Sequence, residues 1–539
     1  MTASRWTMMI GGVAVLAAGC TTEARLPDLE AIYKRTSITT SEGPRRPLIT
    51  VPGTLGSRLV DSDSKRVIWG GGGSAGISAD PEDPEEYRLI ALPVAKADEP
   101  LTELRDTVVP GGILETAQAE VLGIPIDVNV YGKALGVLTV GGFSVDRRSA
   151  RLYTRAERED GLDLQVELAN AEAAKAPKAE AVSVPDEFNS FQYDYDWRRD
   201  LIESAHGLGR FLERKRQILS EKRGVRPESV KFDLLAHSMG TLVARYFLMY
   251  GFSSPGPDGK LPPITWEGAQ FFDRVVLVAP PNAGSVIALD NLINDKELGP
   301  LQPVYPGALL STHPAAYQLM PRARHNRVLI DGEPVDNLFD VSLWERMGWG
   351  LAKPGIEDQL ALLIPDEAEP ERRRARALAY KARLLSRAET FHRMMDRWAP
   401  PPSHLDIFVV IGGGFETPAI AEVDGGTGEF KITTNEEGDG VVLRASALLD
   451  ERMDGDNSSG YRSPLRFKTT LFLPDEHVEL TQNRVFADNL LFWLLDAPRS
   501  TGELARPDNV DLLGNVSDGS APEARREQGP QRFKPGQEN

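Results

Sequence analysis

The chain has 539 residues, of which 41% are hydrophobic and 26% are charged, a composition typical of a globular protein with a large buried core. Its formal net charge of -18 argues against a nucleic-acid partner, because surfaces that bind phosphates are usually basic. The only cysteine, Cys20, excludes internal disulfides and zinc sites built from thiolates.

The N-terminal residues predict a signal peptide. The apolar run Trp6–Ala18 follows Arg5 and ends in small residues, and it is shorter than the roughly 20 residues that a membrane-spanning helix needs. It closes as LAAGC at positions 16–20, which resembles a bacterial lipoprotein signal, although the charged segment before it is thin and Leu16 lies one place upstream of the usual pattern. We therefore expect residues 1–20 to be a lipoprotein-type signal.

Acylation would account for a single cysteine in an exported chain. A free thiol is unusual in such a protein, whereas an acylated Cys20 needs no partner, and two or more acyl chains anchor a protein stably. We expect residues 21–46 to be a tether and the protein to lie in a bacterial cell envelope, lipid-anchored on the periplasmic side of the outer membrane. A plain signal peptide with an incidental cysteine is the alternative.

Beyond the tether, strand-like and helix-like segments alternate as far as about Ala497. This alternation predicts an α/β fold with a mostly parallel sheet flanked by helices. The expected strands are short, apolar and closely followed by turn residues: Leu48–Val51, Phe188–Tyr193, Val230–Leu235, Val275–Val278, Ile407–Ile411 and Phe467–Leu473. The expected helices have an apolar face: Leu201–Arg223, Gly240–Tyr250 and Arg484–Leu495.

Two stretches interrupt the alternation, and one of them divides the predicted core. Residues 284–402 form a connection longer than compact domains usually contain, which predicts an inserted cap or lid subdomain. The core is then formed by residues 47–283 and 403–497, within which residues 61–181 also depart from the pattern. Residues 498–539 are poor in apolar side chains and rich in Pro, Gly and charge, which predicts a disordered tail.

The sequence AHSMG at positions 236–240 predicts a nucleophilic serine, Ser238. It lies between an apolar strand and an apolar helix, the context in which a G-x-S-x-G-like motif forms a sharp turn. Such a turn needs small neighbours, and Ala236 and Gly240 provide them.

A serine hydroxyl needs a base to remove its proton, and in this fold class the acid and then the histidine follow the serine along the chain. Of seven histidines, only His477 follows a late strand and precedes a helix. The other six precede the serine, adjoin it, lie in the presumed insertion or precede a strand: His206, His237, His313, His325, His392 and His404.

The acid is expected in the loop after the strand Ile407–Ile411. Asp439 stands between two glycines there, which lets the backbone bend its carboxylate toward an imidazole. The alternatives in the same region are Asp450, Asp454 and Asp456.

Two backbone N–H groups are expected to bind the oxyanion that forms when the serine attacks. One belongs to Met239, the residue after the nucleophile, and the other to the turn after an early strand. VPGTLGS at positions 51–57 is such a turn, with Thr54 as the candidate donor. No His, Asp or Glu cluster has metal-ligand spacing, and this chemistry needs no cofactor.

Taken in order, these motifs resemble the lecithin:cholesterol acyltransferase family, which includes lysosomal phospholipases. The resembling elements span most of residues 47–495: VPGTLGS at 51–57, YDWR at 195–198, AHSMG at 236–240, Ala279-Pro280, Gly438-Asp439-Gly440 and His477. The resemblance implies an α/β-hydrolase fold in which Ser238 takes an acyl group from a glycerolipid or similar ester and passes it to water or an alcohol. It also places Thr54 and Met239 at the family's oxyanion positions.

The chain departs from this family at three places. Family members commonly brace a lid with a disulfide, which one cysteine cannot form. Val441 stands where the family has a threonine, and residues 284–402 do not match the family's cap. Tyr193, Tyr195 and Trp197 are candidates either for an acyl pocket or for core packing.

Together these residues predict a serine esterase or lipase-like acyl hydrolase, or an acyltransferase, that acts on lipid esters through an acyl-serine intermediate. The expected partners are an ester substrate and, through Cys20, a membrane. Two alternatives remain: an esterase for small soluble esters, and an envelope protein that keeps the hydrolase fold only to bind.

Overall fold

The computed structural model describes residues 46–70, 80–94, 99–101, 104, 106–121, 124–129, 131–146, 188–256, 258–297, 304–325, 327–452 and 461–497. The predicted signal peptide with Cys20, the tether up to residue 45, the predicted tail and the alternative acids Asp454 and Asp456 lie outside the described residues. Within the described ranges, no helix is long and apolar enough to cross a membrane.

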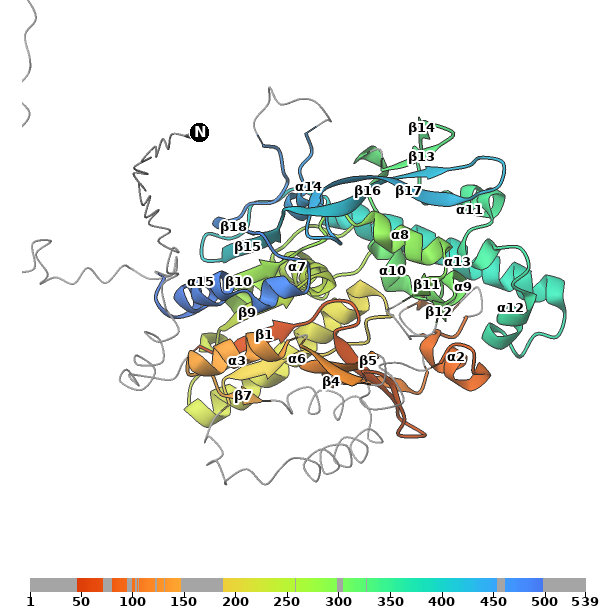
Figure 1. The fold of residues 1–539 in the computed structure, drawn as a ribbon. Coiled ribbons are helices and arrows are strands. Elements are labelled where there is room, and N and C mark those ends of the chain that lie inside the picture. Colours follow the sequence, from red (N-terminus) through yellow and green to blue (C-terminus); the bar gives the residue numbers. More distant parts are fainter. Residues whose placement is uncertain are drawn as a thin grey trace, which may run out of the picture.

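A parallel sheet forms the centre of the molecule (Figure 1). Across the part of the chain that the structure describes, its strand order is β18-β15-β10-β9-β1-β8-β7, and every neighbouring pair is parallel. The chain order reverses between β9 and β1, the place where open α/β sheets bind ligands beyond the carboxyl ends of their strands. The strands are β1 (Leu48–Val51), β7 (Val145–Asp146), β8 (Ser190–Gln192), β9 (Phe232–His237), β10 (Phe272–Val278), β15 (Asp406–Gly412) and β18 (Thr469–Leu473).

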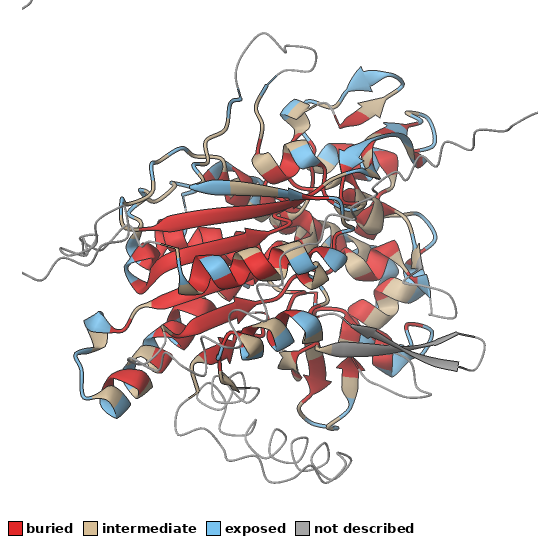
Figure 2. Ribbon diagram, turned by 60° about the vertical axis from the view of Figure 1, so that its left-hand side comes forward, coloured by how far each residue is buried: buried red, intermediate tan, exposed pale blue. Residues whose placement is uncertain are grey.

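Helices bury both faces of this sheet, and its central strands are buried throughout (Figure 2). Along β10, alternate residues from Val275 to Val278 join one apolar cluster and then the other. Helices α6 (Leu201–Arg223) and α7 (Met239–Tyr250) contribute to the first cluster, and α3 (Gly132–Val140) and α15 (Arg484–Leu495) to the second. Burial on both faces explains why these strands are almost continuously apolar in sequence.

Capping residues determine where the long helices begin and end. The Asp200 carboxylate accepts hydrogen bonds from the first turn of α6, and Gly224 ends that helix in the left-handed conformation at φ 63°. The Asn483 side chain caps α15 in the same way, bonding the backbone N–H groups of Val485 and Phe486.

The predicted fold class, a mostly parallel sheet flanked by helices, is confirmed. The predicted segments Leu48–Val51, Leu201–Arg223 and Arg484–Leu495 coincide with β1, α6 and α15, and each other predicted strand overlaps an observed one. The edge strand β7, only two residues long, was not predicted and lies in the stretch that departs from the alternation.

Residues 284–402 form a layer of helices and short strands beside the carboxyl ends of the sheet. Helix α13 is the longest of them in the described chain, and the helices are α8 (Val286–Ile293), α9 (Gly307–Leu310), α10 (Pro314–Gln318), α11 (Val341–Met347), α12 (Glu357–Leu363) and α13 (Pro370–Met395). The short strands are β11 (Lys296–Glu297), β12 (Val304–Tyr305), β13 (Val328–Ile330) and β14 (Glu333–Pro334). The 3-10 turns of this layer are Ala323–His325 and Gly350–Ala352.

A smaller sheet joins this layer to residues that were predicted to belong to the core. Its strand order is β14-β13-β16-β17, and the long hairpin of β16 (Phe415–Val423) and β17 (Phe430–Gly438) is inserted directly after β15. Strand β13 pairs in parallel with β16. The layer is therefore built from both sides of the predicted boundary at residue 402.

The remaining described elements lie around the first turn and the last strand. A sheet of order β3-β2-β4 follows β1, with β2 (Ser57–Asp61), β3 (Val67–Trp69) and β4 (Val108–Ile113). The others are α2 (Pro84–Ile90), the hairpin β5 (Thr116–Val121) with β6 (Ile124–Asn129), α14 (Arg444–Leu448), and the 3-10 turns Pro227–Ser229, Glu267–Phe271 and Glu479–Gln482.

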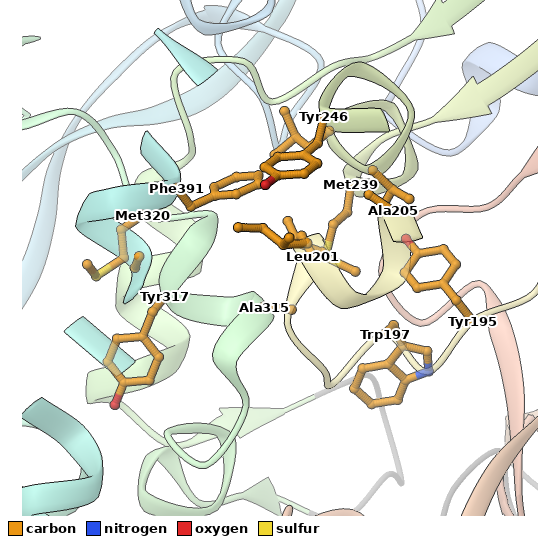
Figure 3. Close-up of a cluster of buried hydrophobic side chains, with 14 of the residues drawn as sticks. Tyr195, Trp197, Leu201, Ala205, Met239, Tyr246, Ala315, Tyr317, Met320 and Phe391 are labelled. Atoms are coloured by element: carbon orange, nitrogen blue, oxygen red, sulfur yellow. The ribbon is translucent and has the colours of Figure 1, made fainter. Parts of the chain in front are cut away.

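Helix α13 packs against the helices that cover the main sheet (Figure 3). The Phe391 ring stacks on Tyr246 of α7 with centroids 6.0 Å apart. Arg387 of α13 pairs at 2.8 Å with Asp200, the residue that caps α6 and whose side chain is fully buried. One carboxylate thus stabilises both the start of α6 and the attachment of α13.

Substitution of Asp200 tests this double role. Asp200→Ala removes the α6 cap and leaves Arg387 without its partner, so we expect the free energy of unfolding to fall by about 3 kcal/mol or more. Asp340 is an exposed cap of α11, and Asp340→Ala should cost only about 1 kcal/mol. Denaturant unfolding of both variants measures the difference, and equal losses would contradict the double role.

Three histidines are buried in neutral form. Burial lowers the pKa of His237 to about 3 and, aided by the charge of Arg198, lowers the pKa of His313 to about 4. The pKa of His392 also lies well below its usual value, chiefly because of burial. In the unfolded chain each has a pKa of about 6.5, so between that pH and about 4 the unfolded state binds protons that the folded state does not.

Stability should therefore fall as the pH falls from about 6.5 to about 4, by up to about 1.4 kcal/mol per pH unit for each of these histidines. The His313 Nε2 bonds the carbonyl of Ile90 at 3.0 Å, and a glutamine amide can make the same bond. His313→Gln should make the pH dependence shallower by about one histidine's share. Denaturant unfolding at pH 7, 6 and 5 gives both slopes, and identical slopes would show that His313 is not held neutral.

Candidate active site

Four loops meet beyond the carboxyl ends of the main sheet. Three of them follow the main-sheet strands β1, β9 and β18, and the fourth follows β17, the second strand of the hairpin inserted after β15. Each carries one residue that the sequence singled out: Thr54, Ser238, Asp439 and His477. Strands β1 and β9 are neighbours at the point where the strand order reverses. The parallel topology thus gathers residues that are more than 400 positions apart in sequence.

Ser238 stands on a strained turn between β9 and α7. Its backbone has φ 51° and ψ -128°, a conformation that costs a residue with a side chain about 1–3 kcal/mol. The Ser238 N–H donates to the carbonyl of Val278 at 2.8 Å. A Cβ on Gly240 would lie 2.3 Å from the Pro52 carbonyl oxygen, and one on Gly53 would lie 2.7 Å from the Ser238 Cβ. Glycine at these two positions lets the turn pack closely.

His477 bonds both Ser238 and Asp439. Its Nε2 lies 2.8 Å from the Ser238 Oγ, and its Nδ1 lies 2.8 Å from the Asp439 Oδ2. The Asp439 carboxylate holds the proton on Nδ1, which turns the Nε2 lone pair toward the serine hydroxyl. The side chains of His477 and Asp439 are 9% and 2% exposed, so little water competes for these bonds.

The β16–β17 hairpin returns the chain to the end of β15, where Asp439 lies. Phe415 pairs with Gly438 at the base of the hairpin, so the chain leaves and returns at adjacent points. The second carboxylate oxygen of Asp439 accepts from the N–H groups of Val441 and Val442 at 3.0 and 2.7 Å. The Val441 contact uses the backbone N–H, which every residue type except proline has, so it does not depend on the valine side chain.

The alternative acid that lies in the described chain, Asp450, bonds Arg452 at 2.9 Å rather than a histidine. Of the other six histidines, His325 bonds Glu451 and His237 bonds the backbone carbonyl of His477. The remaining four bond other backbone carbonyls: His206, His313, His392 and His404. Among the residues with a described placement, no group of three or more His, Cys, Asp or Glu side chains could hold a metal ion.

The side chains of Thr54 and Met239 are in direct contact beside the cavity. The Thr54 hydroxyl donates to the Met239 sulfur at 3.2 Å, and both residues line the same cavity as Ser238. The Met239 N–H belongs to the first turn of α7, where the helix itself offers no acceptor. Three buried aromatic side chains hold the Thr54 turn by bonding its carbonyls: Trp69 to Leu55 at 2.7 Å, Tyr195 to Pro52 at 3.0 Å and Trp197 to Ser57 at 3.2 Å.

An apolar cavity of about 550 Å³ opens beside Ser238. Both the sheet layer and residues 284–402 line it, through side chains that include Leu59, Ile68, Trp69, Ile287, Leu310 and Leu319. Of the three aromatic candidates for a pocket, Trp197 lines the cavity. Tyr193 and Tyr195 instead stack on each other in the core with ring centroids 6.0 Å apart.

Two residues at the site, Tyr131 and Arg198, were given no role in the sequence analysis. The Tyr131 hydroxyl accepts from the Gly53 N–H at 2.8 Å, and no motif marks it, because the contact depends on folding of an irregular stretch. Arg198 is fully buried, lines the cavity and bonds Asp196 and Asp106 at 2.7 Å. The signal for Arg198 was its place in the YDWR motif.

Comparison with known proteins finds matches among solved structures. No family model matches the chain, and no curated protein does. A chain in the crystal structure of the Tle4–Tli4 complex matches at 14% identity and TM-score 0.44, covering 84% of this chain and 98% of its own length. Phospholipase PlaB from Legionella pneumophila matches at 13% identity and TM-score 0.24, covering 61% of this chain and 55% of its own.

The parallel sheet, the helices on both of its faces and the serine on a strand-to-helix turn characterise one fold. This chain has the α/β-hydrolase fold.

Proposed function

We propose that this protein is a serine esterase that cleaves lipid esters through an acyl-serine intermediate. The observation that carries the proposal is the pair of hydrogen bonds that joins His477 to the Asp439 carboxylate on one side and to the Ser238 hydroxyl on the other. A serine hydroxyl is a poor nucleophile unless a base takes its proton, and this arrangement supplies the base and fixes its orientation.

In the first half of the proposed reaction, the Ser238 Oγ attacks the ester carbonyl carbon while its proton passes to the His477 Nε2. The carbonyl oxygen becomes an oxyanion, which the backbone N–H groups of Met239 and Thr54 bind; one such donor commonly contributes about 3 kcal/mol. His477 then gives its proton to the leaving alcohol as the C–O bond breaks. Asp439 stabilises the imidazolium that exists between these two transfers.

In the second half, water or an acceptor alcohol attacks the acyl-serine. His477 takes the proton of the attacking molecule and returns it to the Ser238 Oγ as the acyl group leaves. The same residues therefore serve hydrolysis and acyl transfer, and the acceptor decides between them. The proposed chemistry needs no cofactor.

The cavity beside Ser238 supports a lipid acyl group as the substrate. Its lining is mainly apolar, and a chain of methylenes gains about 0.8 kcal/mol for each one buried. The resemblance of the motifs to the lecithin:cholesterol acyltransferase family supports the same class of substrate. Residues 284–402 provide a large part of the lining, so we propose that this segment acts as the cap.

The first test measures hydrolysis of an ester series from short to long acyl chains, ending with a phospholipid, by the purified protein and its Ser238→Ala variant. We expect turnover to rise with chain length and to fall about a million-fold in the variant, because loss of a triad serine removes the nucleophile. Ser229→Ala is the matched control and should keep full activity, because Ser229 is exposed and precedes the amino end of β9, whereas Ser238 follows its carboxyl end.

The outcomes separate the alternatives. Turnover confined to short esters would keep the serine mechanism and reject the lipid substrate. Equal inertness of wild type and Ser238→Ala on every ester, without labelling of the serine by a fluorophosphonate, would reject the enzyme and favour a binding protein.

We also propose that an acylated Cys20 anchors the protein in a bacterial envelope. Expression of the full chain and of Cys20→Ser in a bacterium fed an alkyne fatty acid tests this. We expect label and membrane fractionation for wild type and neither for the variant, because the acyl chains provide the anchor. Equal labelling of both proteins would rule out Cys20 as the acylation site.

A further inference from the structure

A buried chain of hydrogen bonds connects the proposed oxyanion turn to the proposed catalytic histidine. It passes through Tyr131 and His237, neither of which takes part in the reaction steps above. The Gly53 N–H bonds the Tyr131 hydroxyl at 2.8 Å, that hydroxyl bonds the His237 Nδ1 at 2.8 Å, and the His237 Nε2 bonds the carbonyl oxygen of His477 at 3.1 Å. Tyr131 and His237 are 4% and 6% exposed.

Each bond in this chain can run in only one direction. The Gly53 N–H can only donate, so the Tyr131 oxygen accepts from it. The His477 carbonyl can only accept, so the His237 Nε2 carries a hydrogen. Because His237 is neutral, its Nδ1 has only a lone pair, and the Tyr131 hydroxyl donates to it. Proton positions along the chain therefore follow from the two backbone groups at its ends and from the neutrality of His237.

Neutrality of His237 is consistent with its surroundings. Burial and the neighbouring His477 hold the pKa of His237 at about 3. The two rings lie 5.1 Å apart between centroids, so a charge on His237 would oppose the protonation of His477 that the proposed reaction requires. The Tyr131 hydrogen occupies the Nδ1 lone pair and so keeps a second proton from that nitrogen.

The chain of bonds joins three loops that must keep a fixed spacing. Gly53 belongs to the turn that carries Thr54, His237 precedes Ser238, and the carbonyl of His477 belongs to the loop that carries the base. A Cβ on Gly53 would lie 3.3 Å from the His237 Nδ1, so the turn and this ring are also in close steric contact. The distance between an oxyanion donor and the base depends on these contacts, and misplacement by about 1 Å can cost a hundredfold in rate.

We propose that Tyr131 and His237 are positioning residues that hold the Thr54 oxyanion turn and the His477 loop in register around Ser238. The Tyr131 hydroxyl accepts a hydrogen bond from Gly53 and donates one to His237, and His237 in turn bonds the backbone carbonyl of His477. This inference rests on the proposed esterase function. It adds that these hydrogen bonds help to stabilise the transition state and do not contribute to substrate binding.

The test compares Tyr131→Phe with Tyr380→Phe in the full chain. Tyr380 is also fully buried, and its hydroxyl donates to the Thr312 carbonyl at 2.8 Å away from the cavity lining, so both variants lose one buried hydroxyl. For Tyr131→Phe we expect kcat to fall about 10- to 100-fold with KM changed less than about twofold, because only oxyanion binding is misaligned. Tyr380→Phe should lower Tm by about as much as Tyr131→Phe does, and it should leave kcat unchanged.

A second readout distinguishes positioning from general loosening. A trifluoromethyl ketone of the preferred acyl chain forms a tetrahedral adduct with the serine, whereas the matching ether cannot. In Tyr131→Phe the ketone should lose affinity by the same factor as kcat/KM, while the ether should bind as it does to wild type. His237→Asn keeps an acceptor near the Tyr131 hydroxyl but loses the bond to His477, and it should show the same pattern.

Three results would overturn the inference. They are a Tyr131→Phe enzyme with wild-type kcat, a loss that appears only in KM, and equal losses of affinity for ketone and ether. Each of these requires an active wild type, which distinguishes them from failure of the proposed function. A wild type that turns over no ester and is not labelled at Ser238 would reject the proposed function and this inference together.

Discussion

The backbone at Ser238 is the constraint on which the surrounding structure depends. A residue with a side chain held at φ 51° persists only where its neighbours leave no alternative. One neighbour is the end of β10, whose Val278 carbonyl accepts a hydrogen bond from the Ser238 N–H. The other is the Pro52-Gly53 turn, which fits against the turn at Ser238 only because positions 53 and 240 lack side chains. Strand β1 must therefore lie beside β9, and the turn that carries Thr54 is adjacent to the serine as a consequence.

The layer formed by residues 284–402 is attached through contacts that are costly to break. Asp200 and Arg387 form a largely buried ion pair, and removal of one partner would leave the other charge without compensation. A second attachment lies near the end of α13, where Arg324 pairs with Asp396 inside the layer and with Glu451 outside it. These contacts hold the layer where its residues line the cavity.

The features that could be predicted were those determined by short stretches of the sequence. Apolar runs between capping residues located β1, α6 and α15, and a motif between a strand and a helix singled out Ser238. His477 followed from chain order. Asp439 was chosen over Asp450 because of its glycine neighbours and the resemblance of that segment to a known family. The structure separates the two by tertiary contacts: Asp439 bonds His477, and Asp450 bonds Arg452.

Other features depend on contacts between residues far apart in the sequence, and no local sequence pattern indicates them. Strand β7 is two residues long and is defined only by its pairing with β8. Tyr131 meets Gly53 across 78 positions through an irregular stretch, and no spacing rule connects them. The apolar alternation of β16, with Ala419, Ala421 and Val423 buried, is visible in the sequence, but its pairing with β13 across the predicted boundary is not.

The β16–β17 hairpin has a geometric consequence for how this chain can vary. Because Phe415 and Gly438 are paired at its base, residues can be added or removed in register along its two strands without moving either end. The separation between β15 and the acid along the sequence is therefore nearly independent of their separation in space. Chains that share this arrangement can differ widely in hairpin length while the carboxylate stays in place. The number of residues between β15 and Asp439 is therefore a poor measure of how closely two such chains are related.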